Sequence, residues 1–348
     1  MYPFTPGSFA PKNAWYVVAF RDQVGHELLS RTVVNTPLVI WRTESGEVTV
    51  LDGRCPHRHF PLGKSALEGD TVRCGYHGWA FDASGQCVEI PSQEHAPRAC
   101  RVRQYPHVEH GLWLWVWVGD EDKADPALLP SLEEIGLEGE GLTGHGLIVR
   151  DVACRYQLLN DNLFDLSHLA FLHGTSIGTR ENASTPEELV KRPGFVSSIR
   201  RIKDAPVPAT MWQALDGFET IDRAMGMASY LPGFHAGTTE VSVPDSHPTR
   251  AGERLMWNRV YHSITPCTPR TTLYHFAIAT KPGTDTAALK AALDPVIDED
   301  VFASEEIEKI IDLYDGNPPP ELMVKSDTNA VEGRRMIQAM MDAEGQGS

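Results

Sequence analysis

The chain has 348 residues, of which 41% are hydrophobic and 22% are charged, and its formal net charge is −16. This composition is that of a globular protein with about two domains, and the acidic balance argues against binding to nucleic acid or to an anionic membrane surface. No segment has the roughly 20 apolar residues of a membrane span, and residues 1–6 lack the basic and apolar regions of a secretory signal. We therefore expect a cytoplasmic protein.

Residues 14–120 have the pattern of short strands joined by turns. Residues 33–41 and 47–51 flank a polar turn that ends in Gly46, which is typical of a hairpin. Residues 112–118 alternate tryptophan with aliphatic residues, a pattern that favours a strand covered on both faces. Residues 120–142 are acidic and rich in Gly and Pro, and we interpret them as the connection between two domains.

The remaining residues combine helical and strand patterns. Residues 178–195 are polar and contain several turn-forming residues, so we expect a mobile loop there. Predicted strands span 259–264 and 272–279, and predicted helices span 160–172, 287–313 and 321–342. Together these patterns predict an α+β fold with one domain at residues 1–122 and a second at residues 123–348.

A first set of candidate metal ligands lies in the N-terminal domain. Cys55-Pro56-His57 is followed, after sixteen residues, by Cys74-Gly75-Tyr76-His77. Two cysteines and two histidines on paired loops suit either a zinc ion or a [2Fe–2S] cluster with two histidine ligands. Each loop here offers one Cys and one His, so each can serve both irons of a binuclear cluster, which favours the cluster over zinc. We expect the other four cysteines to be buried as small apolar residues.

A second set of candidate ligands follows in the C-terminal domain. Asp165, His168 and His173 form the pattern D-x-x-H-x-x-x-x-H. In an ideal helix His173 lies about 140° around the axis from His168, so both reach one metal only if the helix ends there, which Gly174 permits. Two histidines and one carboxylate with open positions are the ligands of non-haem Fe(II) oxygenases. The alternative is two helix histidines beside surface aspartates.

The two cysteine-containing segments closely resemble those of Rieske ferredoxins and Rieske oxygenases. Over nearly its whole length the chain resembles the Rieske oxygenases that demethylate aromatic methyl ethers, the vanillate and dicamba O-demethylase group, most specifically at residues 161–168. This resemblance implies a β-rich Rieske [2Fe–2S] domain followed by a helix-grip catalytic domain with an antiparallel sheet. It also implies a homotrimer and a mononuclear iron.

The same resemblance assigns expected roles to individual residues. Residues 298–306 are similar to the stretch that supplies the carboxylate ligand, and we choose Asp300, with Asp298, Glu299, Glu305 and Glu306 as alternatives. Asp165 is expected to bridge His77 of a neighbouring subunit and His168, because a carboxylate accepts hydrogen bonds from both imidazoles.

Two further residues match family positions near the substrate. Asn162 is expected near the iron, in contact with oxygen or substrate, and His262 is expected to hydrogen-bond an aromatic carboxylate. The tryptophan and asparagine that contact dicamba are not evident near Ala291 or in residues 225–234, which argues against dicamba as the substrate.

The reaction implied by the resemblance is monooxygenation with O₂. The resemblance also implies that NADH would reduce a separate ferredoxin-type reductase. Electrons would pass through the cluster to the iron, and hydroxylation of an O-methyl group would release a phenol and formaldehyde from a vanillate-like acid. Alternatives are hydroxylation of an aryl methyl, N-methyl or ring position, a non-catalytic Rieske electron carrier, and a zinc-binding interaction protein.

Overall fold

The computed structural model describes residues 2–207, 215 and 217–345, which form two compact units. The small unit comprises Lys12–Leu129 and Thr265–Thr268, and the large unit comprises the remaining described residues. Both differ at their edges from the predicted domains 1–122 and 123–348. The first residues belong to the large unit because Tyr2 bonds there with Glu321 and with Arg155.

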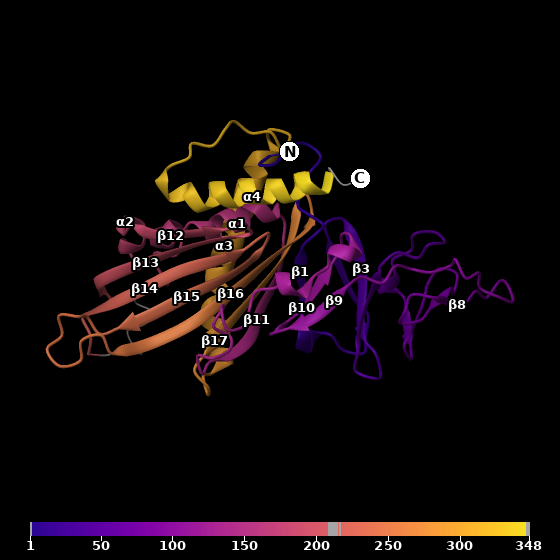
Figure 1. Cartoon of the computed structure of the whole chain (residues 1–348), viewed down its shortest axis with the longest axis horizontal. Coiled ribbons are helices and arrows are strands. Elements are labelled where there is room, and N and C mark those ends of the chain that lie inside the picture. Colours follow the sequence, from indigo (N-terminus) through magenta and orange to yellow (C-terminus); the bar gives the residue numbers. More distant parts are fainter. Residues whose placement is uncertain (1, 208–214, 216, 346–348) are drawn as a thin grey trace. The chain divides into compact units, whose positions relative to one another are not determined.

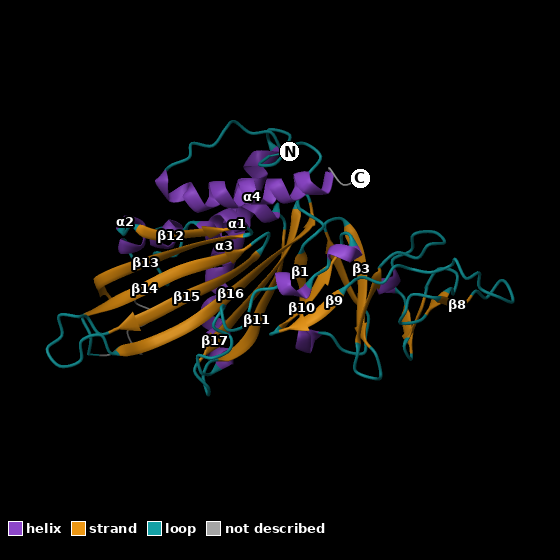
Figure 2. Cartoon of the chain, in the orientation of Figure 1, coloured by secondary structure: helices purple, strands orange, loops and turns teal. Residues whose placement is uncertain are grey.

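The small unit consists of short strands in three sheets, as Figure 2 shows by its many arrows and loops. The strands are β1 (Trp15–Phe20), β9 (His107–His110) and β10 (Trp113–Trp117); β2 (Leu29–Val33), β3 (Thr36–Arg42) and β4 (Val48–Asp52); and β5 (Ala66–Glu68), β6 (Thr71–Arg73), β7 (Ala80–Phe81) and β8 (Cys87–Glu89). The predicted hairpin is confirmed as β3 and β4. The tryptophan-rich strand is the central strand β10, and all its residues are buried.

The large unit contains one seven-stranded antiparallel sheet with helices packed against it (Figure 1). In sheet order the strands are β11 (Thr143–Val152), β17 (Thr271–Thr280), β16 (Arg254–Thr268), β15 (Phe234–Ser242), β14 (Thr220–Tyr230), β13 (Phe195–Pro206) and β12 (Glu187–Arg192). The helices are α1 (Tyr156–Phe164), α2 (Glu181–Ser184), α3 (Thr286–Asp312) and α4 (Thr328–Gly345). The predicted α+β fold is confirmed. No described helix is long and apolar enough to span a membrane.

The predicted loop 178–195 and the start of the last predicted helix differ from the structure. The segment 178–195 is not a loop, because it forms α2 and the edge strand β12. Charged residues are usual on edge strands, where they oppose pairing with another chain. The polar sequence that suggested a loop is therefore explained by the position of β12 at the edge of the sheet. The last helix begins at Thr328 and not at residue 321.

A buried ion pair fixes the start of α1 against α3. The Arg155 side chain donates two hydrogen bonds of 2.7 Å to the Glu308 carboxylate, which also accepts from the Arg155 backbone amide at 3.0 Å. Both side chains are almost fully buried. Removing one partner of such a pair typically costs about 3–5 kcal/mol, so this contact sets how the two helices face each other.

A second buried chain of hydrogen bonds joins α1 to the sheet. Asn160 donates to the Pro232 carbonyl at 2.9 Å and accepts from His235 at 2.9 Å, and His235 in turn accepts from the Ser229 hydroxyl at 2.7 Å. Burial lowers the pKa of His235 to about 3, so its ring is neutral at physiological pH. The middle of α1 is thereby bonded to residues of β14, of β15 and of the turn between them.

Candidate metal centres and active site

Two loops of the small unit share one backbone geometry around Cys55 and Cys74. In each, the cysteine amide donates to the carbonyl five residues later, and the amide four residues later donates to the cysteine carbonyl, with distances between 2.8 and 3.0 Å. That fourth residue, His59 or Gly78, has a left-handed φ of 59° or 73°. The equivalence with Gly78 identifies His59 as a turn residue, in agreement with its lack of ligand spacing.

The two loops bring together all four predicted cluster residues. Cys55 and Cys74 are buried, with exposed fractions of 1% and 3%. The rings of His57 and His77 lie 4.6 Å apart, and His57 stacks on Trp79 with an interplanar angle of 2°. His57 is half-buried and His77 is exposed, so the thiols lie inside and the imidazoles face outward.

The chemistry of this group fits a metal cluster. Burial, together with the adjoining Cys74 thiol, raises the pKa of Cys55 to about 11, so a thiolate needs the positive charge of a metal. Burial lowers the pKa of His57, whose Nδ1 atom is buried and has no hydrogen-bond partner among the described residues. Two buried thiols beside two imidazoles are the ligand set of a [2Fe–2S] cluster with two histidine ligands.

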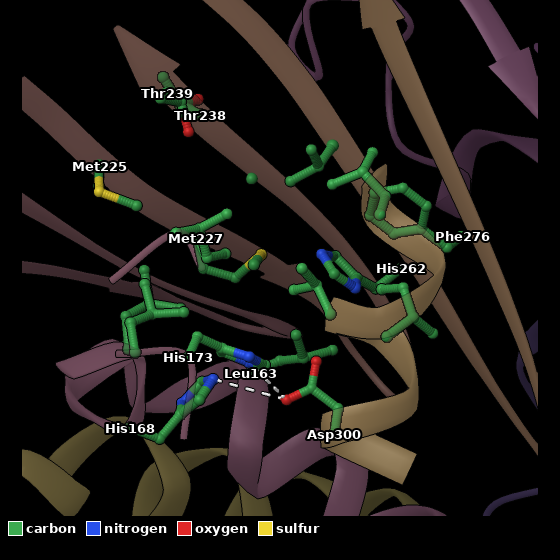
Figure 3. A pocket seen from close by; sticks show the side chains of 18 of the residues that line it. Leu163, His168, His173, Met225, Met227, Thr238, Thr239, His262, Phe276 and Asp300 are labelled. Atoms are coloured by element: carbon green, nitrogen blue, oxygen red, sulfur yellow. Dashed lines mark hydrogen bonds and ion pairs between the residues drawn. The ribbon is translucent and has the colours of Figure 1, made fainter. Parts of the chain in front are cut away.

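The large unit gathers His168, His173 and Asp300. Their candidate ligand atoms all lie within 4.8 Å of one another. One Asp300 oxygen is 3.0 Å from Nε2 of His173 and 3.8 Å from Nε2 of His168, as the dashed lines in Figure 3 indicate. His173 and Asp300 are 1% and 5% exposed. Residues from the segment after α1 and from the middle of α3 therefore converge on one buried point.

A break in the helix places both histidines on the same side. Helix α1 ends at Phe164, Asp165 is extended, and a short 3₁₀ turn follows at Leu166–Ala170, so the predicted helix 160–172 is wrong beyond residue 164. The tight turn after His173 depends on Gly178, whose amide donates to the His173 carbonyl at 3.0 Å. A Cβ atom on this glycine would lie 1.6 Å from the backbone oxygen of Leu169.

Each histidine is oriented through its other ring nitrogen. Nδ1 of His168 donates to the backbone carbonyl of Asp165 at 2.6 Å, and Nδ1 of His173 donates to the Glu299 carboxylate at 2.6 Å. Both Nε2 atoms then present lone pairs toward Asp300, an arrangement that a cation between them would satisfy. Two imidazoles and one carboxylate fit a mononuclear Fe(II).

The pKa shifts of the two histidines follow from these surroundings. Burial lowers the pKa of His168, which keeps its ring neutral. Burial also acts to lower the pKa of His173, but its hydrogen bonds and charge interactions with Asp300 and Glu299 outweigh burial and raise it. The negative charge around His173 is therefore placed to favour a cation, either a proton or a metal.

An apolar cavity of about 120 Å³ adjoins this group (Figure 3). An engineered apolar cavity of about 150 Å³ holds benzene, so the space suits a molecule with one aromatic ring. Apart from the three candidate ligands, its polar side chains are His262, Thr238 and Thr239, and its lining has no Lys or Arg. Nδ1 of His262 and the hydroxyl of Tyr274 form a hydrogen bond of 2.6 Å, and burial lowers the pKa of His262 to about 4. In the tautomer in which the Tyr274 hydroxyl donates, the neutral His262 ring has its Nε2–H available to the cavity.

Comparisons with known proteins agree with both sites. Residues 14–106 match the Rieske [2Fe-2S] domain, and residues 152–343 match the vanillate O-demethylase oxygenase C-terminal domain. The chain belongs to the Rieske oxygenases of the vanillate O-demethylase family. It is the oxygenase component of a Rieske monooxygenase, with a [2Fe–2S] cluster and a mononuclear iron.

Relatives of this Rieske oxygenase match along nearly their whole length. It is 29% identical to the dicamba O-demethylase oxygenase component of Stenotrophomonas maltophilia, over 96% of this chain and 98% of the relative. It is also 29% identical to a vanillate O-demethylase oxygenase subunit of Pseudomonas sp., over 96% of both chains. A crystal structure of dicamba monooxygenase bound to 3,6-dichlorosalicylic acid matches with 28% identity and a TM-score of 0.86, covering 96% of this chain and 98% of that one.

The remaining predicted residues of the oxygenase lie close to the candidate ligands. Asn162 donates to the Asp300 carboxylate at 3.0 Å, so its amide holds a ligand oxygen. The Asp165 carboxylate accepts from the amide and hydroxyl of Ser167 at 2.8 and 2.9 Å, and it lies 3.4 Å from a nitrogen of buried Arg200. Within one chain the contact with His168 is made by the backbone of Asp165 and not by its carboxylate.

The carboxylates that the sequence left as alternatives to Asp300 each have a different partner in the structure. Asp298 pairs with Arg150, Glu305 accepts from the Ala153 amide, and Glu306 pairs with Lys309. Glu299 faces the far nitrogen of His173. Sequence reasoning treated Glu299 only as an alternative ligand and missed this contact, because the contact depends on how α3 is rotated against the loop after α1.

Proposed function

We propose that this oxygenase O-demethylates a methoxylated aromatic acid, vanillate-like in size, to a phenol and formaldehyde. The observation that supports the proposal most is the one-ring apolar cavity bordered by His168, His173 and Asp300. The dicamba and vanillate O-demethylases to which the chain is similar support the reaction type. O₂ is the second substrate.

Within this proposal the two units divide the chemistry. Cys55, His57, Cys74 and His77 hold the cluster in the N-terminal domain, and His168, His173 and Asp300 hold the iron in the C-terminal domain. The bound iron supplies activation of O₂ for insertion into a C–H bond. Glu299 and the Asp165 carbonyl keep the two imidazoles in the tautomer that leaves Nε2 free. Electrons come from NADH through a separate ferredoxin-type reductase.

Asn162 and His262 complete the proposed site. Asn162 fixes the orientation of the Asp300 carboxylate, so that the oxygen that would bind the iron keeps its direction. His262 donates a hydrogen bond from Nε2 to an oxygen of the substrate, and the hydroxyl of Tyr274 holds its ring in place. After hydroxylation of the methyl group, the hemiacetal loses formaldehyde and leaves the phenol.

We propose further that the active assembly is a homotrimer in which the cluster loops of one subunit dock beside Asp165 of the next. The large unit has a second cavity, of about 480 Å³, lined by Asp165, His168 and Asn162 among others. Its lining includes exposed apolar side chains, among them Ile307 at 48% and Leu322 at 90%. Exposed apolar groups of this size are typical of an interface, and His77 is exposed on the small unit.

A single-turnover assay tests the proposed reaction. The chemically reduced, iron-loaded protein is mixed with O₂ and, one at a time, with methoxybenzoates, and formaldehyde and the phenol are measured. We expect one of each per subunit with at least one methoxybenzoate. A reoxidised cluster with no formaldehyde for every methoxybenzoate would contradict O-demethylation, and a product from an aryl methyl or N-methyl compound would assign that reaction instead.

A further inference from the structure

Arg223 is an arginine that is almost completely buried next to the active-site cavity. It lies on β14, two residues before Met225, and side chains at this spacing point to the same face of a strand. Met225 and Met227 line the cavity on that face. Arg223 is 2% exposed, and burial lowers its pKa to about 10, so the guanidinium is charged at neutral pH.

The guanidinium of Arg223 lacks adequate hydrogen-bond acceptors. Its Nη2 donates to the sulfur of Met225 at 2.8 Å and to the Ile177 carbonyl at 3.5 Å. Its Nε and Nη1 atoms are buried and have no partner among the described residues. A charged donor left without acceptors is costly in a protein interior, and native structures rarely keep one without a purpose.

A second buried donor converges on the same sulfur. Asn182 is fully buried, its carbonyl accepts from Thr179, and its Nδ2 donates to the sulfur of Met225 at 3.4 Å. A thioether is a weak acceptor, and a methionine side chain changes shape readily. Met225 therefore occupies a position that is built for a stronger acceptor, and in Figure 3 it lies on the side of the cavity away from Asp300.

The charge of Glu181 acts on Arg223, but the two residues form no ion pair in the described structure. One oxygen of Glu181 is itself buried and has no hydrogen-bond partner among the described residues. The guanidinium thus has its charge partly balanced while its hydrogen bonds stay available. This is the condition in which an incoming anion gains two directed bonds without having to displace an existing ion pair.

We propose that Arg223 and Asn182 form an anion subsite, which the carboxylate or sulfonate of the substrate enters as it displaces the Met225 side chain. This inference rests on the proposed function and adds the place where the acid group of the substrate binds, at the end of the aromatic ring away from the methyl group that is oxidised. His262 supplies a hydrogen bond but no positive charge, and none of the described residues that line the cavity is a Lys or an Arg. Arg223 is the cation that such an acid requires.

The test measures binding, which is independent of turnover. Calorimetry on the iron-loaded protein compares 4-methoxybenzoate and 4-methoxybenzenesulfonate with the neutral 4-methoxybenzamide. We expect both anions to bind the wild type more tightly than the amide, and Arg223→Met to weaken the anions by about 30-fold or more while the amide changes by less than about threefold. Arg201→Met is the control, because Arg201 lies on the adjacent strand with its side chain 58% exposed, and it should leave all three affinities unchanged.

Equal affinity of the wild type for anion and amide, or an unchanged anion affinity in a folded Arg223→Met variant, would overturn the inference even if formaldehyde is formed. If that variant does not fold, a crystal structure of the wild type with 4-methoxybenzenesulfonate decides. Sulfonate oxygens bonded to Arg223 with Met225 displaced support the subsite, and a sulfonate bonded to His262 with Met225 in place excludes it. Failure of demethylation alone leaves these results unchanged.

Discussion

The two candidate metal sites of this oxygenase are assembled in different ways. The candidate cluster residues all lie within residues 55–77, and each loop closes with its own backbone hydrogen bonds. The candidate iron site instead joins His168 and His173 to Asp300, which lies on a helix more than a hundred residues later. It depends on the buried Arg155–Glu308 pair that sets α1 against α3. One site is local in sequence, and the other exists only once the large unit has folded.

The sites also differ in exposure, in keeping with their tasks. The imidazole of His77 is exposed, so a partner can approach the cluster for electron transfer. His173 and Asp300 are buried beside an apolar cavity, where water is largely excluded from the reacting groups. The following substitutions are designed to affect one site and spare the other.

The largest effect is expected from Cys74→Ser. Loss of one thiolate removes the cluster, because a serine oxygen is a poor ligand for this soft metal site, and the red-brown absorption should disappear together with all turnover. Visible spectroscopy and iron analysis measure this directly. Cys100→Ser, on the same unit but outside the paired loops, should keep the colour. A coloured Cys74→Ser protein would mean that the loops do not hold the cluster.

His168→Ala should do the reverse, because it should remove the mononuclear iron and leave the cluster in place. We expect the visible spectrum of the cluster to remain, bound iron to fall from three to two per chain, and turnover to be lost, because two ligands hold the iron poorly. The measurements are iron content, the visible spectrum and single turnover. Loss of the colour, or retention of three irons with turnover, would remove His168 from the proposed ligand set.

Asp165→Asn tests communication between the sites. Asparagine retains the cap on the Ser167 amide but loses the negative charge, so both metals should remain bound. We expect cluster-dependent turnover to fall by about 100-fold, the upper range for loss of a carboxylate that orients a histidine. Stopped-flow reoxidation of the cluster with substrate and O₂ measures it, and a wild-type rate would rule out a bridging role.

Glu299→Gln should have a smaller effect, confined to the large unit. The amide can still contact Nδ1 of His173 but no longer makes that imidazole more basic, so iron affinity should fall by about 10-fold. Iron titration of the protein with its cluster intact provides the measurement. Asp298→Asn, one residue earlier and paired with Arg150, is the matched control and should bind iron normally. Equal affinities in the two variants would refute the role of Glu299.

The smallest effect concerns stability and pH. Between pH 6.5 and about 3 the unfolded chain protonates His235 while the folded chain does not, because burial lowers the folded pKa to about 3. Stability should therefore fall as the pH drops through this window, by up to about 1.4 kcal/mol per pH unit from this residue. Urea unfolding at pH 6.5 and 5.5 should show a smaller drop for His235→Gln than for the wild type. Identical drops would indicate that His235 is protonated in the folded protein.

The contrast between the sites also explains what the sequence could predict. The paired Cys and His motif is local, so its four residues could be recognised before any fold was known, and the tryptophan-rich strand and the helix that contains Asp300 follow from short-range patterns. The interruption of α1 at Asp165 was missed because residues 160–172 contain no Gly or Pro; its local signal is the Asp165 side chain, which caps the next turn by accepting from the Ser167 amide. Strand β12 was missed because most of its side chains are polar, as in a loop. It forms a strand because its backbone pairs with β13, and the sequence of β12 alone does not show this pairing.

The contacts made by Glu299, Tyr274 and Arg223 could not be predicted from the sequence either. Each depends on which way an element faces after the sheet and helices have packed, and sequence spacing does not specify such rotations. Their partners are His173, His262 and Met225, which lie on other elements or point to the same cavity. The contacts proposed to select the substrate are therefore the ones that local sequence motifs predict least.

Oxygen labelling tests the central claim, hydroxylation of a methyl group followed by loss of formaldehyde, most directly. A single turnover under ¹⁸O₂ with the methoxybenzoate that yields formaldehyde is followed by mass spectrometry of the phenol. Because the hemiacetal breaks at the bond between the methyl carbon and the ether oxygen, the phenol should retain its original ¹⁶O. A phenol containing ¹⁸O would show attack on the ring carbon and would contradict O-demethylation at this site.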